Sequence, residues 1–161
     1  LEAVVACPTG VIGPYDFRGS MMGAVIHGAA AAKPTLYVDG AYDFVDVRDV
    51  AECHVKAVEI PEAAGERFLA TEGFLWFSEA AAILRKAFPA YDKKIPKRNL
   101  PDWVLKMMAK FQPVYQQTVT ELGRTRKASN AKASRVLGVK FRTAEEALIA
   151  SARSLIDLKV V

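Results

Sequence analysis

The chain has 161 residues, of which 52% are hydrophobic and 25% are charged, and its formal net charge at pH 7 is +4. This composition excludes a disordered or fibrous chain and is typical of a globular domain. No apolar run approaches the roughly 20 residues that a membrane-spanning helix needs, and no secretory signal is visible at the start. Cys7 and Cys53 lack CxxC spacing, so we expect buried thiols in a reducing compartment. We therefore expect one domain over residues 1–161, located in the cytoplasm, with no membrane partner and no metal.

The first part of the chain has the pattern of strands. Residues 3–8 form an apolar run that predicts a strand covered on both faces. The alanines and methionines of residues 19–32 favour a helix. Residues 33–40 predict a short strand closed by an Asp-Gly turn. Residues 41–47 alternate, which places Tyr42 and Phe44 on one face of a further strand and Val45 and Val47 on the other.

The period becomes helical over residues 47–59. The apolar stripe of this predicted helix consists of Val47, Val50, Ala51, His54, Val55 and Val58. A histidine on such a stripe with no second ligand in register is interpreted as a core residue rather than as a catalyst or metal ligand. His27 is interpreted in the same way.

The remaining pattern predicts one strand, at residues 65–71, and then helices. Ser78 is the expected N-cap of a helix over residues 79–88, with Glu79 in its first turn. Asn99 and Pro101 mark the start of a helix over residues 102–111. We interpret Trp76 and Trp103, at two of these helix starts, as core or lobe-packing residues.

Two further helices complete the chain. Gly138 is suitably placed as the left-handed cap of a helix over residues 130–138. Thr143 and Glu146 form a capping box at the head of the helix that follows. With strands dominating the first 70 residues, the pattern predicts an open α/β sheet, which binds ligands beyond the carboxyl ends of its strands. The Gly- and Pro-rich turn at residues 8–14 occupies such a position.

Three stretches together resemble one family. They are "CPTGVIGP" at 7–14, "YDFVDVRDVAECHVKAVE" at 42–59 with "GERFLAT" at 65–71, and "NAKASRVLGVKFRTAEEAL" at 130–148. In this order and spacing they resemble extended short-chain dehydrogenases/reductases, specifically the NAD(P)-dependent epimerase/dehydratase group that includes dihydroflavonol 4-reductases. The resemblance implies the C-terminal part of a Rossmann-like, NAD(P)-binding fold, with a few parallel strands and a mostly helical substrate-binding lobe.

The resemblance extends only to the C-terminal half of that family. No Gly-rich GxxGxxG loop follows a strand here, and no tyrosine is followed four residues later by lysine. Four residues after Tyr15, Tyr37, Tyr42, Tyr91 and Tyr115, the chain has Gly19, Ala41, Asp46, Ile95 and Val119, respectively. We therefore assign no catalytic residue, and we expect the N-terminal cofactor-binding half to lie on other polypeptide. The chain alone is expected to be inactive.

The resemblance implies a cofactor-binding wall for NAD or NADP. Pro8, Thr9, Gly10 and Val11 would line the nicotinamide, and Ser20 would lie in the stretch that reaches towards the cofactor phosphates. Proline donates no N–H and glycine allows close approach, which suits contact with a flat ring.

The resemblance also implies a wall for a small-molecule carbonyl substrate. Its candidate residues are Tyr15, Phe17, Met21 and Met22, which together offer an apolar surface. Such a surface suits an aromatic or aliphatic carbonyl compound.

Several alternatives stay open beside this interpretation. Arg48 and Asp49, at a helix start, form either a structural cap or ion pair, or a ligand contact. A stand-alone half-domain would bind a partner or self-associate as a homo-oligomer through its exposed sheet surface. The basic clusters at 85–98 and 124–142 suggest nucleic acid, but no nucleic-acid-binding signature accompanies them. We interpret them as solvated helix faces and expect no nucleic-acid partner.

Overall fold

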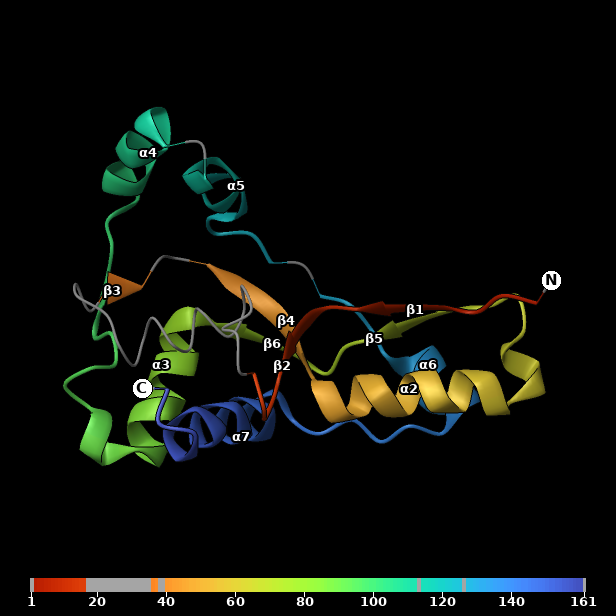
Figure 1. Ribbon diagram of the computed structural model, residues 1–161. Helices are drawn as coiled ribbons and strands as arrows, with labels where there is room; N and C mark the ends of the chain where they lie inside the picture. Colours follow the sequence, from red (N-terminus) through yellow and green to blue (C-terminus); the bar gives the residue numbers. More distant parts are fainter. Residues whose placement is uncertain (1, 17–35, 38–39, 113, 126, 161) are drawn as a thin grey trace.

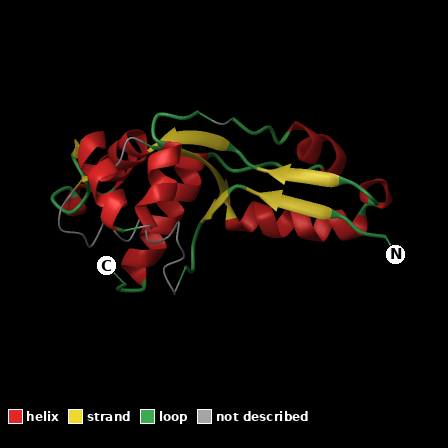
Figure 2. Ribbon diagram, turned by 90° about the horizontal axis from the view of Figure 1, so that it is seen from above, coloured by secondary structure: helices red, strands yellow, loops and turns green. Residues whose placement is uncertain are grey.

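A parallel pair of strands opens the fold in this computed structural model, which describes residues 2–16, 36–37, 40–112, 114–125 and 127–160. β1 (Val5–Pro8) pairs with β5 (Arg67–Ala70) in the register Val5 to Arg67 and Pro8 to Ala70. Helix α2 (Val47–Glu59) runs beneath both strands, as Figure 2 shows, and α6 (Ala131–Leu137) packs nearby on β5.

A second sheet contains three strands in the order β2-β4-β6. β2 (Gly10–Ile12) is parallel to β4 (Ala41–Asp46), and β4 is antiparallel to β6 (Gly73–Trp76). Two helices, α3 (Phe77–Ala87) and α7 (Ala144–Asp157), pack together and against this sheet. Figure 1 shows α3 and α7 below β4 and β6, at the end of the molecule away from β1.

The remaining elements are short strands and helices. β3 (Leu36–Tyr37) and β7 (Arg98–Asn99) form a parallel pair of two residues each. Single 3₁₀ turns occur at Pro61–Ala63 and Pro89–Tyr91. Helices α4 (Asp102–Phe111) and α5 (Val114–Glu121) pack against each other at the top of Figure 1.

The described residues bury two apolar clusters, one for each main sheet. Strand β4 serves both, because alternate residues of a strand point to opposite faces: Phe44 enters one cluster and Val45 the other. The first cluster joins β4 to α3 and α7 and includes Ile12, Leu84, Ala147, Leu148 and Leu155. The second joins β5 to α2 and α6 and includes Cys53, Ala57, Phe68, Ala133 and Leu137.

The expected fold class is confirmed, and so are two helix caps. Thr143 Oγ1 accepts a hydrogen bond from Glu146 N, while the Glu146 carboxylate accepts one from Thr143 N, which completes the capping box. Gly138 has φ 70° and caps α6 in the left-handed conformation. The expected N-cap Ser78 is wrong: α3 begins earlier, at Phe77, with Trp76 as its N-cap. Glu79 nonetheless accepts the Trp76 N–H at 2.9 Å.

Three burial predictions are wrong. The predicted strand 3–8 is covered on one face only, because Val5 on its other face is 48% exposed. The buried residues of α2 are Asp49, Cys53 and Ala57 rather than the valine stripe. His54 is exposed, with Nδ1 2.7 Å from the Val50 carbonyl oxygen.

Trp103, predicted to be a packing residue, is also exposed. Leu105 and Ala109 form the buried face of α4 instead. Trp76, predicted to pack, is half-buried and stacks edge-on against Phe74.

The predicted helix over residues 19–32, including His27, lies outside the described residues. Both cysteines are free thiols; Cys53 is buried and Cys7 is half-buried. Among the described helices, none is long and apolar enough to span a membrane.

The Leu148 side chain is fully buried between α7 and the β2-β4-β6 sheet. We expect Leu148→Ala to lower the free energy of unfolding by about 2–5 kcal/mol, because it leaves a cavity that the structure cannot fill. Leu158→Ala removes a partly exposed leucine from the end of the same helix and should cost clearly less. Urea titration of both variants measures the difference, and equal losses would contradict the core described here.

Candidate functional site

The turn after β1 carries the chain from one sheet to the other. Thr9 N donates to the Ala70 carbonyl oxygen at 3.1 Å, and Thr9 Oγ1 lies 3.4 Å from the same oxygen. The next residue, Gly10, already pairs with Phe44 in the second sheet. The turn therefore begins where the parallel strands β1 and β5 end, which is the edge at which open α/β sheets bind ligands.

The turn ends in a rigid segment, Gly13-Pro14-Tyr15. Gly13 has φ 151°, and a Cβ at this position would lie 2.6 Å from Cγ1 of Val47, at the start of α2. Tyr15 has φ 68°, which is unusual for a bulky residue. Its N–H donates to Ser154 Oγ of α7 at 2.9 Å, and the residue is 70% exposed. Contacts with α2 and α7 therefore fix a turn that leaves the Tyr15 side chain accessible.

Among the predicted site residues, the structure describes Pro8, Thr9, Gly10, Val11 and Tyr15. Pro8 is exposed, while Thr9, Gly10 and Val11 are half-buried. The Val11 side chain packs against the second cluster, so an approaching ring would meet its main chain. The other predicted site residues, Phe17, Ser20, Met21 and Met22, lie outside the described residues.

The N-terminus of α2 contains a buried carboxylate paired with Arg48. Asp46 is the N-cap, and its Oδ1 accepts hydrogen bonds from Arg48 N and Nε, both at 2.8 Å. Burial by itself raises the pKa of Asp46, but the hydrogen bonds and charge of Arg48, with the charge of Arg142, outweigh it. The pKa of Asp46 consequently lies below its ordinary value.

A second buried carboxylate connects α2 to the segment before α7. Asp49 Oδ2 accepts the Arg142 N–H at 2.7 Å, and Oδ1 pairs with the Arg142 guanidinium. Burial raises the pKa of Asp49, and the hydrogen bonds and charge of Arg142 offset this only in part. These contacts confirm the ion-pair interpretation of Arg48 and Asp49.

Sequence reasoning missed three residues that hold the turn and helix α2. An aspartate directly before a helical pattern is an N-cap signal, so Asp46 was available from the sequence. Arg142 and Ser154 gave no local signal, because each bonds to a partner more than 90 positions away.

Two further kinds of chemistry were considered for the described side chains: nucleophilic attack by a cysteine thiol and the binding of a metal ion. Burial, with the negative charges of Asp49 and Glu52, raises the pKa of the Cys53 thiol to about 11, so it is not a thiolate nucleophile at neutral pH. Within the described ranges, no group of three His, Cys, Asp or Glu side chains is arranged to hold a metal ion.

Comparisons with known proteins agree with this geometry. Residues 1–70 match the family model described as "NAD dependent epimerase/dehydratase family". The chain is 28% identical over 159 residues, 94% of its length, to an uncharacterized oxidoreductase of Saccharomyces cerevisiae, and covers 42% of that protein. It is 34% identical over 94 residues, 56% of its length, to cinnamoyl-CoA reductase 1 of Petunia hybrida, and covers 27% of it.

Solved structures share the fold. The yeast methylglyoxal/isovaleraldehyde reductase, solved as a complex with NADPH, matches 99% of this chain with a TM-score of 0.72 and 22% identity. The match covers 48% of the yeast chain. The chain therefore spans less than half the length of these relatives.

Gly13→Ala tests the contact between the turn and α2. Gly65 also has a positive φ, 75°, but a Cβ there would meet nothing within 4 Å. Gly65→Ala should therefore cost only the backbone strain, about 1 kcal/mol, whereas Gly13→Ala adds the overlap with Val47 and should cost clearly more. Thermal or urea unfolding of both variants measures this, and an equal cost would mean that the turn does not press on α2.

The lowered pKa of Asp46 predicts a pH-dependent contribution to stability. A carboxyl with a lower pKa in the folded state stabilises the fold above its unfolded pKa, and this stabilisation is lost as the pH falls through the folded pKa. Asp46→Asn should lower the free energy of unfolding at neutral pH by up to about 1 kcal/mol, since Arg48 is partly solvated. Urea titrations at about pH 7 and pH 3 should show this deficit shrinking at the lower pH.

The control for Asp46→Asn is Asp157→Asn, which removes a carboxylate from the exposed end of α7. A deficit for Asp46→Asn that is constant or larger at low pH would contradict the assigned direction.

Proposed function

We propose that the chain, whose residues 1–70 match the NAD-dependent epimerase/dehydratase family, is the C-terminal, substrate-binding half of an NAD(P)-dependent carbonyl reductase. The proposal rests on one observation. The Pro8–Val11 segment, which joins β1 to β2, lies at the carboxyl ends of the parallel strands β1 and β5, within residues 1–70 that match the family. This is the edge at which such sheets bind dinucleotides.

Residues 8–11 fit one side of a nicotinamide ring. Pro8 is exposed and offers an apolar ring without an N–H, and Gly10 has no side chain to obstruct a flat group. The nicotinamide, when bound, supplies the hydride that reduces a carbonyl. The chain's own contribution is to position the ring and exclude water from one face. Ser20 is proposed to reach towards the cofactor phosphates.

The substrate wall is proposed to begin at Tyr15. Its exposed side chain follows the fixed turn directly, and its N–H is held by Ser154. Together with Phe17, Met21 and Met22, it would offer an apolar surface to an aliphatic or aromatic carbonyl compound. The names of two relatives, a methylglyoxal/isovaleraldehyde reductase and a cinnamoyl-CoA reductase, support this substrate class.

The proton donor of the reaction is proposed to lie on polypeptide outside this sequence. A carbonyl that accepts hydride also needs a proton, and no tyrosine here is followed by the lysine that would assist it. The family members that this chain matches are more than twice as long as the matched region. We therefore assign the Gly-rich loop and the Tyr-Lys pair to the remaining half.

The chain alone should not oxidise NADPH in the presence of methylglyoxal, because it lacks a proton donor of the required kind. Absorbance at 340 nm follows the reaction, with the full-length yeast methylglyoxal/isovaleraldehyde reductase as the positive control. Turnover by the purified 161-residue chain would refute the assignment of the proton donor to another half.

A fusion tests the cofactor wall. The part of the yeast reductase that precedes its match is joined to Leu1, and the steady-state KM for NADPH is measured with methylglyoxal. Gly10→Leu should raise this KM by about tenfold or more, a change that corresponds to about 1.4 kcal/mol, because its side chain would obstruct the approach of the ring. Ala131→Leu, an exposed position on α6, should leave KM unchanged. An unchanged KM in Gly10→Leu would reject residues 8–11 as the wall.

A further inference from the structure

We propose that helix α4 is a docking surface for an anionic membrane, on which the helix lies in the plane of the lipid headgroups. The contact is made by the α4 apolar stripe, defined as the side chains of Trp103, Met107 and Phe111. The expectation of no membrane partner considered only spanning segments, and a helix that lies on a membrane needs none. The proposal goes beyond the proposed reductase function and does not depend on it.

The α4 apolar stripe is a contiguous exposed surface. Its three residues are four positions apart, so they lie along one face of the helix. Trp103 is 67% exposed, Met107 is 49% exposed and Phe111 is 81% exposed. Leu105 and Ala109, on a different face, are buried. Exposed hydrophobic residues are ordinary when they are scattered singly, whereas a contiguous group of large ones marks an interaction site.

The stripe belongs to a peripheral part of the fold. Figure 1 shows α4 and α5 above β4 and β6, with α3 and α7 below these strands. Among the described residues, the buried members of the two apolar clusters include none from α4. A partner can therefore contact α4 without disturbing either cluster.

Positive charge borders the α4 apolar stripe. Lys106 and Lys110 are exposed and, at helical spacing, lie along one side of it. The segment 92–111 contains two acidic residues, Asp92 and Asp102. Its basic residues are Lys93, Lys94, Lys97, Arg98, Lys106 and Lys110. Large apolar side chains beside lysines are the pattern of helices that lie in the membrane interface, and the positive charge is attracted to anionic lipid.

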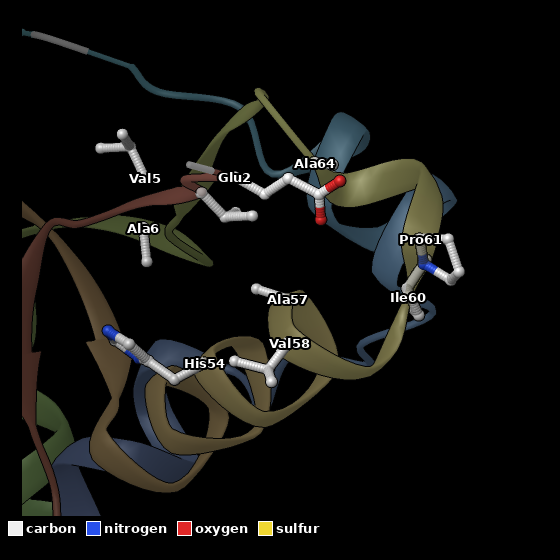
Figure 3. Close-up of a pocket in the computed structure, with 10 residues that line it drawn as sticks. Glu2, Val5, Ala6, His54, Ala57, Val58, Ile60, Pro61 and Ala64 are labelled. Carbon is white, nitrogen blue, oxygen red and sulfur yellow. The ribbon is translucent and has the colours of Figure 1, made fainter.

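A second exposed apolar region lacks this positive charge. It is the groove between β1 and α2, with a volume of about 610 Å³, which Figure 3 shows. Val58 lines this groove and is 88% exposed. Glu2 also lines it, and Glu62 belongs to the 3₁₀ turn next to it. The groove therefore does not suit an anionic surface, and it provides a control for the α4 apolar stripe.

Charge also favours lipid over a second copy of this chain. Two copies packed through their α4 apolar stripes would bring the lysines beside both stripes into one interface, where like charges repel each other. Anionic headgroups would neutralise the same lysines. The apolar side chains would then lie below the headgroups and the ammonium groups at their level.

Vesicle sedimentation tests the proposal with the purified 161-residue chain. The vesicles contain phosphatidylcholine alone or with about 30% phosphatidylserine, which supplies a negative surface. We expect binding to the anionic vesicles to be at least about tenfold tighter than to the neutral ones. About 1 M salt should weaken it, because screening limits the reach of charges to about 3 Å. Absence of binding, or equal binding to both vesicles, overturns the proposal.

Phe111→Ser should weaken binding to the anionic vesicles by about tenfold or more, because binding scales with the apolar area that is inserted. Val58→Ser is the matched control, since it removes an equally exposed apolar side chain from the groove, and binding should not change. Replacement of both Lys106 and Lys110 by Gln should remove most of the preference for anionic vesicles. Equal effects of Phe111→Ser and Val58→Ser contradict the assignment to α4.

Tryptophan fluorescence locates the contact. The chain has two tryptophans, so Trp76→Phe leaves Trp103 as the only one. Its emission should shift to shorter wavelength on anionic vesicles and be quenched by brominated lipid, because the indole leaves water for the interface. In Trp103→Phe, which keeps Trp76, vesicles should leave the emission unchanged. A Trp103 emission that stays constant while the chain binds rejects the proposed contact.

Two further outcomes would assign the α4 apolar stripe to another occupant and overturn the proposal. One is a dimer in analytical ultracentrifugation that Phe111→Ser abolishes, which assigns the stripe to a second copy. The other is loss of vesicle binding in the fusion described above, which assigns the stripe to the other half of the enzyme. None of these measurements requires oxidation of NADPH, so they stay separate from the test of the proposed function.

Discussion

The buried carboxylate of Asp49 fixes the position of α2 relative to α7. It accepts the main-chain N–H of Arg142 and pairs with the guanidinium, so the first turn of α2 is held against the segment that enters α7. A buried charge that loses its partner costs several kcal/mol, which makes this connection hard to replace. The turn after β1 rests on the same two helices, through Gly13 against Val47 and Tyr15 against Ser154. The candidate site therefore depends on a contact that is not itself part of it.

Residues 8–11 connect the two main sheets. Pro8 ends β1 beside Ala70 of β5, and Gly10 already pairs with Phe44 of β4 in the second sheet. Between them, Thr9 donates its N–H to the Ala70 carbonyl oxygen. The backbone of this segment is therefore held by both sheets.

Local features of the sequence predicted much of the fold. The capping box at Thr143 and the left-handed Gly138 were found because each is satisfied by residues within one helical turn. The turn predicted at residues 8–14 is only partly correct, because Pro8 ends β1 and Gly10–Ile12 form β2, so that only Thr9 and the Gly13-Pro14 segment lie outside strands. The buried face of α2 was predicted wrongly, because the valines were chosen on hydrophobicity alone. In the structure, the helix buries the smaller Cys53 and Ala57 together with Asp49, which is paired with Arg142.

By itself, the sequence determined the α/β class, the strands β1, β4 and β5, the helices α2, α3, α4, α6 and α7, and the absence of a Tyr-x-x-x-Lys pair from this chain. These properties depend on backbone propensity and on residues a few positions apart. Only the tertiary structure decided that Arg142 pairs with Asp49, that Ser154 holds Tyr15, and that Val5 of β1 is exposed. Those outcomes depend on which distant segments meet in space, and an isolated residue carries no signal of a partner more than 90 positions away.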